Sequence, residues 1–306
     1  MFLFLKSAVT CAPLMNTGYH GLQLNATGHL PTTSIMSIMS TGVGAIYRTG
    51  KECTMDIAMK DKFLELWGTY FPGAELPIAF YYADEPGDLE KVKAAAERHC
   101  FLGQLAAVRK GRSLCFDNES IGCFGGRRYL GFEQQLMPNF EYFLSCGIPG
   151  KMEGERYKKT PDLVLEMMKK APMLEAPARY AVFKRWDQLE AADEPAVIIF
   201  QDKPDVLSGL FTLSGFDESD IYAVIAPFSA GCGSICLHPY LEQQKENPRA
   251  VIGMFDVSAR PWVKKDTLSF AVPMKKFARM VDDMAESFLI TPSWEKVKKR
   301  MNLGAS

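Results

Sequence analysis

Long apolar runs and an excess of one charge are both missing from this sequence. No stretch approaches the roughly 18 consecutive apolar residues that a membrane-spanning helix needs. Lys and Arg total 35, Asp and Glu total 36, and the net charge is −1. No overall field therefore attracts nucleic acid or an acidic membrane surface. We expect neither a nucleic acid nor a membrane as a partner.

Cysteines are few and irregularly spaced. Eight occur in 306 residues, far below the density of a disulfide-stapled secreted domain, and no Cys-x-x-Cys pair is present. The usual ligand spacings of zinc fingers and ferredoxins are therefore missing. The hydrophobic content of 47% suffices to bury a core without disulfides. We expect thiols that are not oxidised, in a reducing, cytoplasmic compartment.

Residues 1–54 differ from the rest of the sequence. Residues 7–54 are rich in Thr, Ser, Gly and Met and have no clear hydrophobic period. Lys6 interrupts the first apolar residues, which are too few for a signal peptide. We interpret residues 1–54 as a poorly ordered leader, or as the product of an upstream start codon with Met39 or Met55 as the true start.

One pattern occurs twice. Residues 77–86 and 195–204 both read Pro, six residues, Asp, any residue, Pro. Each copy is followed further along by a Gly-Cys pair, Gly122-Cys123 and Gly231-Cys232. The pattern predicts two related halves, residues 55–160 and 161–306, which pack as one globular unit. Each half would hold a strand, a helix and a Gly-Cys loop.

Hydrophobic periodicity predicts helices and strands throughout residues 55–306. Helices are expected at 56–70, 87–97, 100–110, 136–146, 161–170, 205–213, 274–288 and 293–301, with another from about 234. Strands are expected at 77–83, 113–116, 178–183, 196–200, 221–226, 250–255 and 267–272. This alternation indicates an α/β fold, with a mixed α+β fold as the alternative. The strand directions cannot be deduced from the pattern.

The cysteines are the first candidates for chemistry. Cys100, Cys115 and Cys123 form one local set, and Cys232 and Cys236 form another. Thiolates suit zinc, cuprous copper and iron–sulfur clusters, provided that enough of them converge. Alternatively, a thiol that follows a glycine at a helix start becomes a reactive nucleophile. In the plainest interpretation these are small buried apolar residues.

Arginines near the glycine loops offer a different kind of site. The segment 122–128 combines three glycines with Arg127 and Arg128, and its backbone N–H groups could cradle a phosphate or a carboxylate. Further along, Asp256 and Arg260 are one helical turn apart. An ion pair that braces a loop is the ordinary interpretation of that spacing, and an arginine that faces a ligand is the other.

Five segments together carry a resemblance, residues 100–111, 122–131, 230–232, 255–260 and 271–273. They resemble the domain of unknown function 169 (ArCR) family of bacteria and archaea. The resemblance covers roughly residues 56–301. Its members have no assigned reaction, so it implies no activity. It does imply that Cys100, Cys123 and Cys232 hold positions typical of the family, whereas Cys115, Cys146 and Cys236 find no place in it.

Three functional hypotheses follow. In the leading one, Cys100, Cys123 and Cys232 converge on an iron–sulfur cluster, zinc or another thiophilic metal, with a redox or sensing role and a redox partner. In the second, no metal is bound, and the glycine loops with Arg127, Arg128 and Arg260 hold a small anionic ligand. In the third, the protein is a thiol-dependent enzyme with one cysteine much more reactive than the others.

Overall fold

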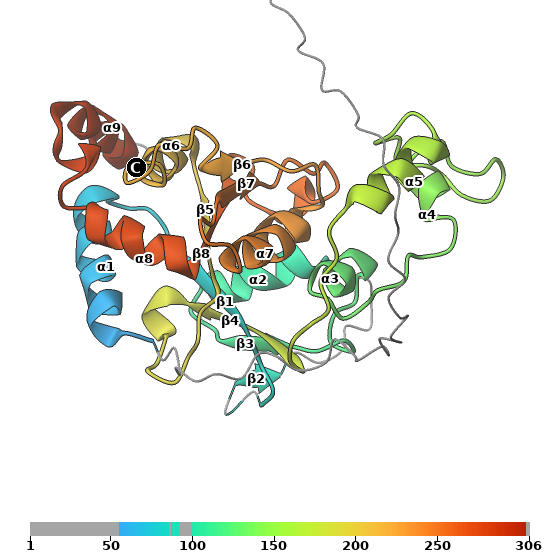
Figure 1. The fold of residues 1–306 in the computed structure, drawn as a ribbon, viewed down its shortest axis with the longest axis horizontal. Helices are drawn as coiled ribbons and strands as arrows, with labels where there is room; N and C mark the ends of the chain where they lie inside the picture. The colour runs from blue at the N-terminus through green and yellow to red at the C-terminus, as the bar shows by residue number, and fades with distance from the viewer. Residues whose placement is uncertain (1–54, 86, 88, 92–99, 304–306) are drawn as a thin grey trace, which may run out of the picture. The chain divides into compact units, whose positions relative to one another are not determined.

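The computed structural model describes residues 55–85, 87, 89–91 and 100–303, which belong to one compact unit (Figure 1). The leader predicted for residues 1–54 lies outside the described residues. None of the described helices is both long enough and apolar enough to cross a membrane.

An eight-stranded mixed sheet runs through the described part of the chain, in the order β2-β3-β4-β1-β5-β8-β7-β6. The outer pairs β2–β3 and β6–β7 are parallel, and all the other neighbours are antiparallel. The strands are β1 (Ile78–Ala83), β2 (Glu90–Lys91), β3 (Leu114–Phe116), β4 (Tyr180–Arg185), β5 (Val197–Asp202), β6 (Val224–Ile225), β7 (Ala250–Gly253) and β8 (Leu268–Pro273). The fold is therefore mixed α+β.

The described helices begin at residues that favour helix starts. Asp56 caps α1, because its carboxylate accepts hydrogen bonds from the N–H groups of Ala58 and Met59. The helices are α1 (Ile57–Tyr70), α2 (Phe101–Arg109), α3 (Phe124–Tyr129), α4 (Phe140–Phe143), α5 (Pro161–Lys170), α6 (Pro204–Leu213), α7 (His238–Gln243), α8 (Met274–Asp283) and α9 (Pro292–Leu303). A π-helical turn, η2 (Gly233–Leu237), runs directly into α7. Shorter 3₁₀ turns are η1 (Trp186–Gln188), η3 (Arg260–Trp262) and η4 (Phe288–Ile290).

The two faces of the sheet carry separate cores, because alternate side chains of a strand point to opposite faces. From β5, Ile198 and Phe200 join a core with α1, α6, α8 and α9. Val197 and Ile199 of the same strand join a second core with α2 and η2. Cys232 and Cys236 belong to this second core, and Cys100 and Cys123 pack against it.

Three expected elements differ from the structure. The strand expected at 221–226 is only Val224–Ile225, and Ile221 before it is 84% exposed, because this connection runs over the surface. The helix expected at 136–146 is reduced to the single turn α4. The prediction of a helix at 87–97 is wrong for Glu90–Lys91, which forms strand β2 and pairs with β3. The rest of that expected helix lies largely outside the described residues.

The two halves of the sheet have corresponding strand orders when each is read from its own edge inward. Strands β2, β3, β4 and β1 succeed one another from one edge, and β6, β7, β8 and β5 do so from the other. The two Gly-Cys pairs, however, are not equivalent in this order. The helical segment that joins β6 to β7 begins at Gly231-Cys232, whereas the helix between β2 and β3 begins after Cys100 and not after Cys123. The two related halves stay a prediction.

Candidate functional site

Three helices begin at the three cysteines that the sequence singles out. Cys100 is the N-cap of α2, Cys123 is the N-cap of α3, and Cys232 precedes η2. In the chain they are far apart, but α3 packs against η2 and the side chains of all three adjoin one core. We call Cys100, Cys123 and Cys232 the thiol cluster.

The thiols are close enough to influence each other's ionisation. Burial raises the pKa of Cys232 well above its ordinary value, and negative charge on Cys123, Cys236 or Cys100 raises it further. Burial also raises the pKa of Cys100, and the neighbouring Cys123 adds to this shift. The positions implied by the family resemblance are therefore neighbours in space.

Glycines allow the three helix starts to approach so closely. A Cβ added at Gly126 would lie 2.7 Å from Ile121 and 3.0 Å from Phe101 Cβ, which is the first residue of α2. A Cβ at Gly231 would lie 2.7 Å from Leu102, also in α2. At Gly125 the nearest atom is Cys232 Sγ, at 3.8 Å. Because Gly126 and Gly231 have no side chain, α3 and the start of η2 can pack directly against α2.

The cysteines differ in exposure. Cys100 and Cys123 are half-buried, while Cys232 and Cys236 are buried. Cys123 Sγ accepts a hydrogen bond from the N–H group of Gly126 at 3.3 Å. None of the six described cysteines is in a disulfide.

Two further cysteines lie elsewhere. Cys115 is buried on the other face of the sheet with Tyr81 and Val182, and Cys146 is exposed after α4. Neither belongs to the thiol cluster.

The carboxylate of Asp256 lies beside the thiol cluster. It accepts hydrogen bonds from the N–H group of Gly231 at 3.2 Å and from Ser258 N–H at 3.1 Å, so it fixes the loop after β7 to the start of η2. Negative charge on Asp256 helps to raise the pKa of both Cys100 and Cys232. The sequence offered no signal for this contact, because Gly231 donates through its backbone.

Arg260 braces the same loop, but not through the expected ion pair. Its guanidinium group donates to the backbone carbonyls of Met254, Thr267, Lys264 and Lys265. The interpretation of Asp256 and Arg260 as partners is therefore wrong, although a bracing role for Arg260 is correct.

The other two candidate arginines, Arg127 and Arg128, differ in their hydrogen bonds. Arg128 donates to the carbonyl of Gln134 at 2.7 Å. Arg127 Nε is buried without a hydrogen-bond partner among the described residues. Backbone carbonyls thus engage Arg128 and Arg260, and a ligand-binding role for all three arginines stays a prediction.

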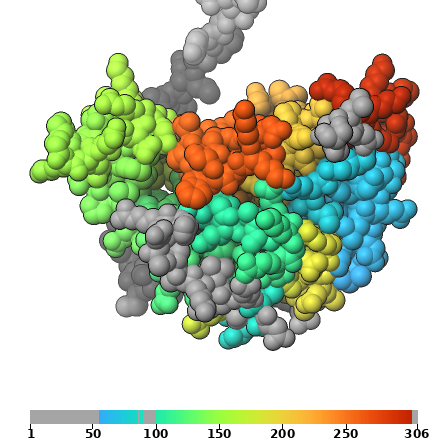
Figure 2. Space-filling model, turned by 180° about the vertical axis from the view of Figure 1, so that it is seen from behind, coloured from blue at the N-terminus to red at the C-terminus, as the bar shows by residue number. Residues whose placement is uncertain are grey.

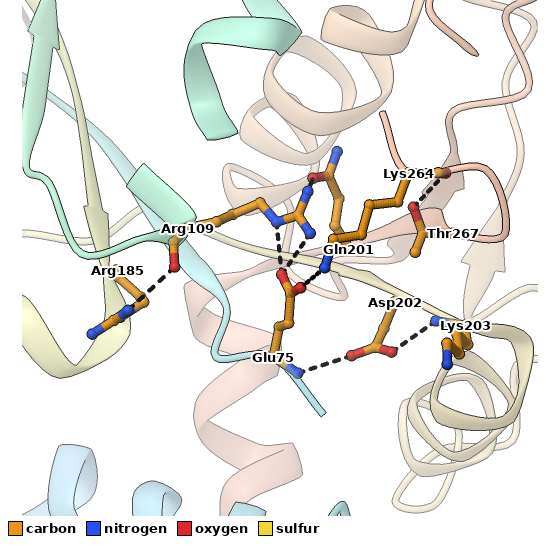
Figure 3. Close-up of polar contacts among 8 residues, drawn as sticks. All are labelled: Glu75, Arg109, Arg185, Gln201, Asp202, Lys203, Lys264 and Thr267. Carbon is orange, nitrogen blue, oxygen red and sulfur yellow. Dashed lines mark hydrogen bonds and ion pairs between the residues drawn. The ribbon is translucent and has the colours of Figure 1, made fainter. Parts of the chain in front are cut away.

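A polar network holds the far end of α2 (Figure 3). Arg109, in the last turn of α2, donates to Glu75 Oε2 at 2.7 Å and to Gln201 Oε1 at 3.1 Å. Lys264 Nζ also contacts Glu75. The network joins α2, the end of β5 and the loop that Arg260 braces. The helix that begins after Cys100 and the loop that carries Asp256 are thus joined to each other at a second place.

Asp202, the aspartate of the second Asp-x-Pro, belongs to this network. It accepts from the N–H groups of Lys203 at 2.8 Å and Glu75 at 3.1 Å. Burial nevertheless raises its pKa. These two backbone hydrogen bonds at the end of β5 give Asp202 a structural role.

The metal hypothesis gains no support from ligand geometry. Among the described residues, no group of three or more His, Cys, Asp or Glu side chains is placed to hold a metal ion. The three cysteines are therefore neighbours that do not form a ready coordination shell.

Comparisons with known proteins give a family but no activity. No curated protein and no solved structure matches the chain. A family model described as uncharacterised ArCR matches residues 74–283, which include the whole thiol cluster, Asp256 and Arg260. The chain therefore belongs to the domain of unknown function 169 family.

Proposed function

We propose that this chain is a thiol-dependent protein in which Cys123 is the reactive group. The observation that carries the proposal is the meeting of three helix starts, each with a cysteine, at one place. Helix N-termini present unpaired N–H groups and the positive end of the helix dipole, which stabilise a thiolate.

The neighbours of Cys123 suit supporting roles. Cys232 is buried and its pKa is raised, so it stays a neutral thiol at physiological pH. Cys100 is half-buried, and its pKa is also raised. Cys123 combines partial exposure with an N–H donor on its sulfur. It is therefore the member of the cluster best prepared to attack.

Conjugate addition is a chemistry that such a thiol performs without a cofactor. Cys123 Sγ forms an S–C bond to the β-carbon of an α,β-unsaturated carbonyl compound while the C=C π bond opens. The thiol proton passes through water to the α-carbon, which completes the addition without a leaving group.

Competitive alkylation tests the proposal. The purified protein would receive a limiting amount of N-ethylmaleimide at pH 7.5, and mass spectrometry would give the labelled fraction of each cysteine. We expect Cys123 to react at least about tenfold faster than the exposed Cys146, since the N–H group of Gly126 already donates to the Cys123 sulfur that attacks. Cys123→Ser should abolish the fast phase, and the matched Cys146→Ser should leave it unchanged. Equal rates at Cys123 and Cys146 would refute the proposal.

A thiophilic metal or iron–sulfur site is the second candidate. It is favoured by the effect of Cys123 on the pKa of Cys100 and of both residues on the pKa of Cys232, because a bound cation would relieve the repulsion among thiolates. Iron, sulfide and zinc contents of anaerobically purified protein separate the two candidates. Stoichiometric metal that is lost in each single Cys→Ser variant would favour this second function. Unchanged metal content in all three variants would remove it.

We also infer that the two halves of the sheet are related. Support comes from the strand order, in which β2, β3, β4 and β1 correspond to β6, β7, β8 and β5. Cys100 and Cys232 then hold equivalent places, and the thiol cluster draws residues from both halves.

A further inference from the structure

Three exposed apolar side chains stand on two loops beside the thiol cluster, the loop before Cys232 and the loop that carries Asp256. Phe228 is 66% exposed, Phe255 is 61% exposed and Val257 is 65% exposed. Phe228 precedes Cys232 in the same loop, and Phe255 and Val257 flank Asp256 in sequence. We call these three residues the apolar rim.

Hydrogen bonds tie the apolar rim to the thiol cluster. Asp256, between the two rim residues, accepts from Gly231 N–H, which is adjacent to Cys232. Lys158 lies over the ring of Phe228 at 3.8 Å, and its neighbour Tyr157 lies close enough to Ser258 and Asp256 for both to affect the pKa of its phenol. Phe228 and the loop after β7 therefore both lie beside the segment that holds Tyr157 and Lys158. Figure 2 shows this loop, in orange, at the surface beside the light-green residues around α4 and α5 and the green residues of α2.

The charged groups described at the rim are already engaged by the protein. Asp256 is bonded to Gly231 and Ser258, the guanidinium group of Arg260 donates to backbone carbonyls, and Lys158 lies on Phe228. What these segments offer to a ligand is therefore mainly apolar surface. Exposed aromatic and aliphatic side chains gathered beside polar chemistry are typical of a binding surface.

We propose that the thiol site accepts a neutral, apolar electrophile whose apolar part is held by Phe228, Phe255 and Val257. This inference rests on the proposed function, because it names the substrate class of Cys123. The covalent step is the conjugate addition described above. Removal of the apolar part from water lowers the free energy of the encounter complex and of the transition state for addition.

A matched pair of maleimides tests the inference. Cys123 and Cys146 would each be labelled with apolar N-cyclohexylmaleimide and with the carboxylate-bearing N-maleoyl-β-alanine. The rate ratio of the two probes at Cys123 is divided by the same ratio at Cys146, which cancels their intrinsic reactivities. We expect a quotient of about ten or more for the unmodified chain, from burial of part of the cyclohexyl ring.

Variants assign the preference to the rim. The triple variant Phe228→Ser, Phe255→Ser and Val257→Ser should bring the quotient close to one while circular dichroism stays unchanged, since all three side chains are exposed. Ile290→Ser, at a position 58% exposed in η4, is the control and should keep the full quotient.

The outcomes separate this inference from the proposed function. If Cys123 outpaces Cys146 with both probes but the quotient is near one, the apolar substrate class is wrong and the reactive thiol stands. A high quotient that survives the triple variant would likewise overturn the role of the rim. If Cys123 never outpaces Cys146, both proposals fail.

Discussion

A single buried carboxylate organises the sheet face opposite the thiol cluster. Asp193 is 6% exposed and accepts from Lys184 Nζ at 2.9 Å, from Glu190 N–H at 2.7 Å and from the hydroxyl group of Tyr81. Lys184 is only 5% exposed. Tyr81 and Lys184 are both buried, so their polar groups lose water on folding and depend on Asp193 for hydrogen bonds.

Removal of this carboxylate should be costly. We expect Asp193→Ala to lower the free energy of unfolding by about 3–5 kcal/mol, because the buried ammonium group of Lys184 would lose its closer, buried counter-charge and keep only the solvent-exposed carboxylate of Glu190, at 3.5 Å. Urea denaturation at pH 7 measures the change.

Lys62→Ala is the matched control, since its ion pair with Asp282 lies on the surface. Its cost should stay below about 1 kcal/mol. Equal effects of the two substitutions would show that burial does not decide the energy of these pairs.

At the scale of elements, the short helix α3 depends on one of its two glycines. A Cβ at Gly126 would approach Ile121 Cγ2 to 2.7 Å, whereas a Cβ at Gly125 would meet Cys232 Sγ at an ordinary 3.8 Å. Both glycines lie in α3, so their difference reflects packing and not helix propensity.

This difference gives a paired prediction. Gly126→Ala should destabilise the protein by about 1–3 kcal/mol, because α3 must move away from α2. Gly125→Ala should be neutral or stabilising by up to about 1 kcal/mol, since alanine is the better helix former. Thermal unfolding measures both.

The labelling rate of Cys123 adds a functional readout. It should change in Gly126→Ala, since the N–H group on its sulfur belongs to this residue. An undisturbed rate together with undisturbed stability would contradict the close packing of α3 on α2.

Across the whole molecule, several ionisable groups are buried in their neutral forms. Burial raises the pKa of the Cys232 and Cys236 thiols well above their ordinary values. It also raises the pKa of the Tyr81 and Tyr82 phenols. Each group is therefore easier to deprotonate in the unfolded chain than in the folded one, so alkaline solution favours unfolding.

The expected pH profile follows from the direction of these shifts. The stabilisation is fully present below the unfolded pKa values, near 9 for Cys and 10 for Tyr, and is lost as the pH rises through the higher folded values. We expect the free energy of unfolding to fall above about pH 9, with a limiting slope of about 1.4 kcal/mol per pH unit for each group. Urea titrations between pH 7 and 11 measure it.

Tyr82→Phe should flatten this fall, because one titrating group is removed. The exposed Tyr222, which is 65% accessible, gives a control in Tyr222→Phe that should keep the slope of the unmodified chain. A profile that is level up to pH 11 would contradict the raised pKa values.

Local patterns predicted most of the elements, because the signals that start and stop them lie within a few residues. Asp56 and Thr160 cap their helices, and the apolar runs before Asp84 and Asp202 form β1 and β5. The predictions were wrong where the pattern was weak, as in the single turn α4 and the two-residue strand β6.

The site was only partly accessible to sequence reasoning. Composition and spacing selected the cysteines as candidates, and the family resemblance reduced them to Cys100, Cys123 and Cys232. Whether these thiols meet depends on strand order and on backbone contacts at Gly126 and Gly231, which no local pattern encodes. The partners of Asp256 and Arg260 were missed for the same reason, because they are N–H and C=O groups that every residue possesses.

The sequence by itself thus determined the helices, the strands, the family and the choice of thiols, since these follow from side-chain identity and short-range order. Only the tertiary structure decided which thiols are neighbours, which arginines are engaged by carbonyls and where apolar side chains remain exposed beside the cluster. These properties arise from the packing of segments distant in the chain, and packing is settled by the shape of the whole core.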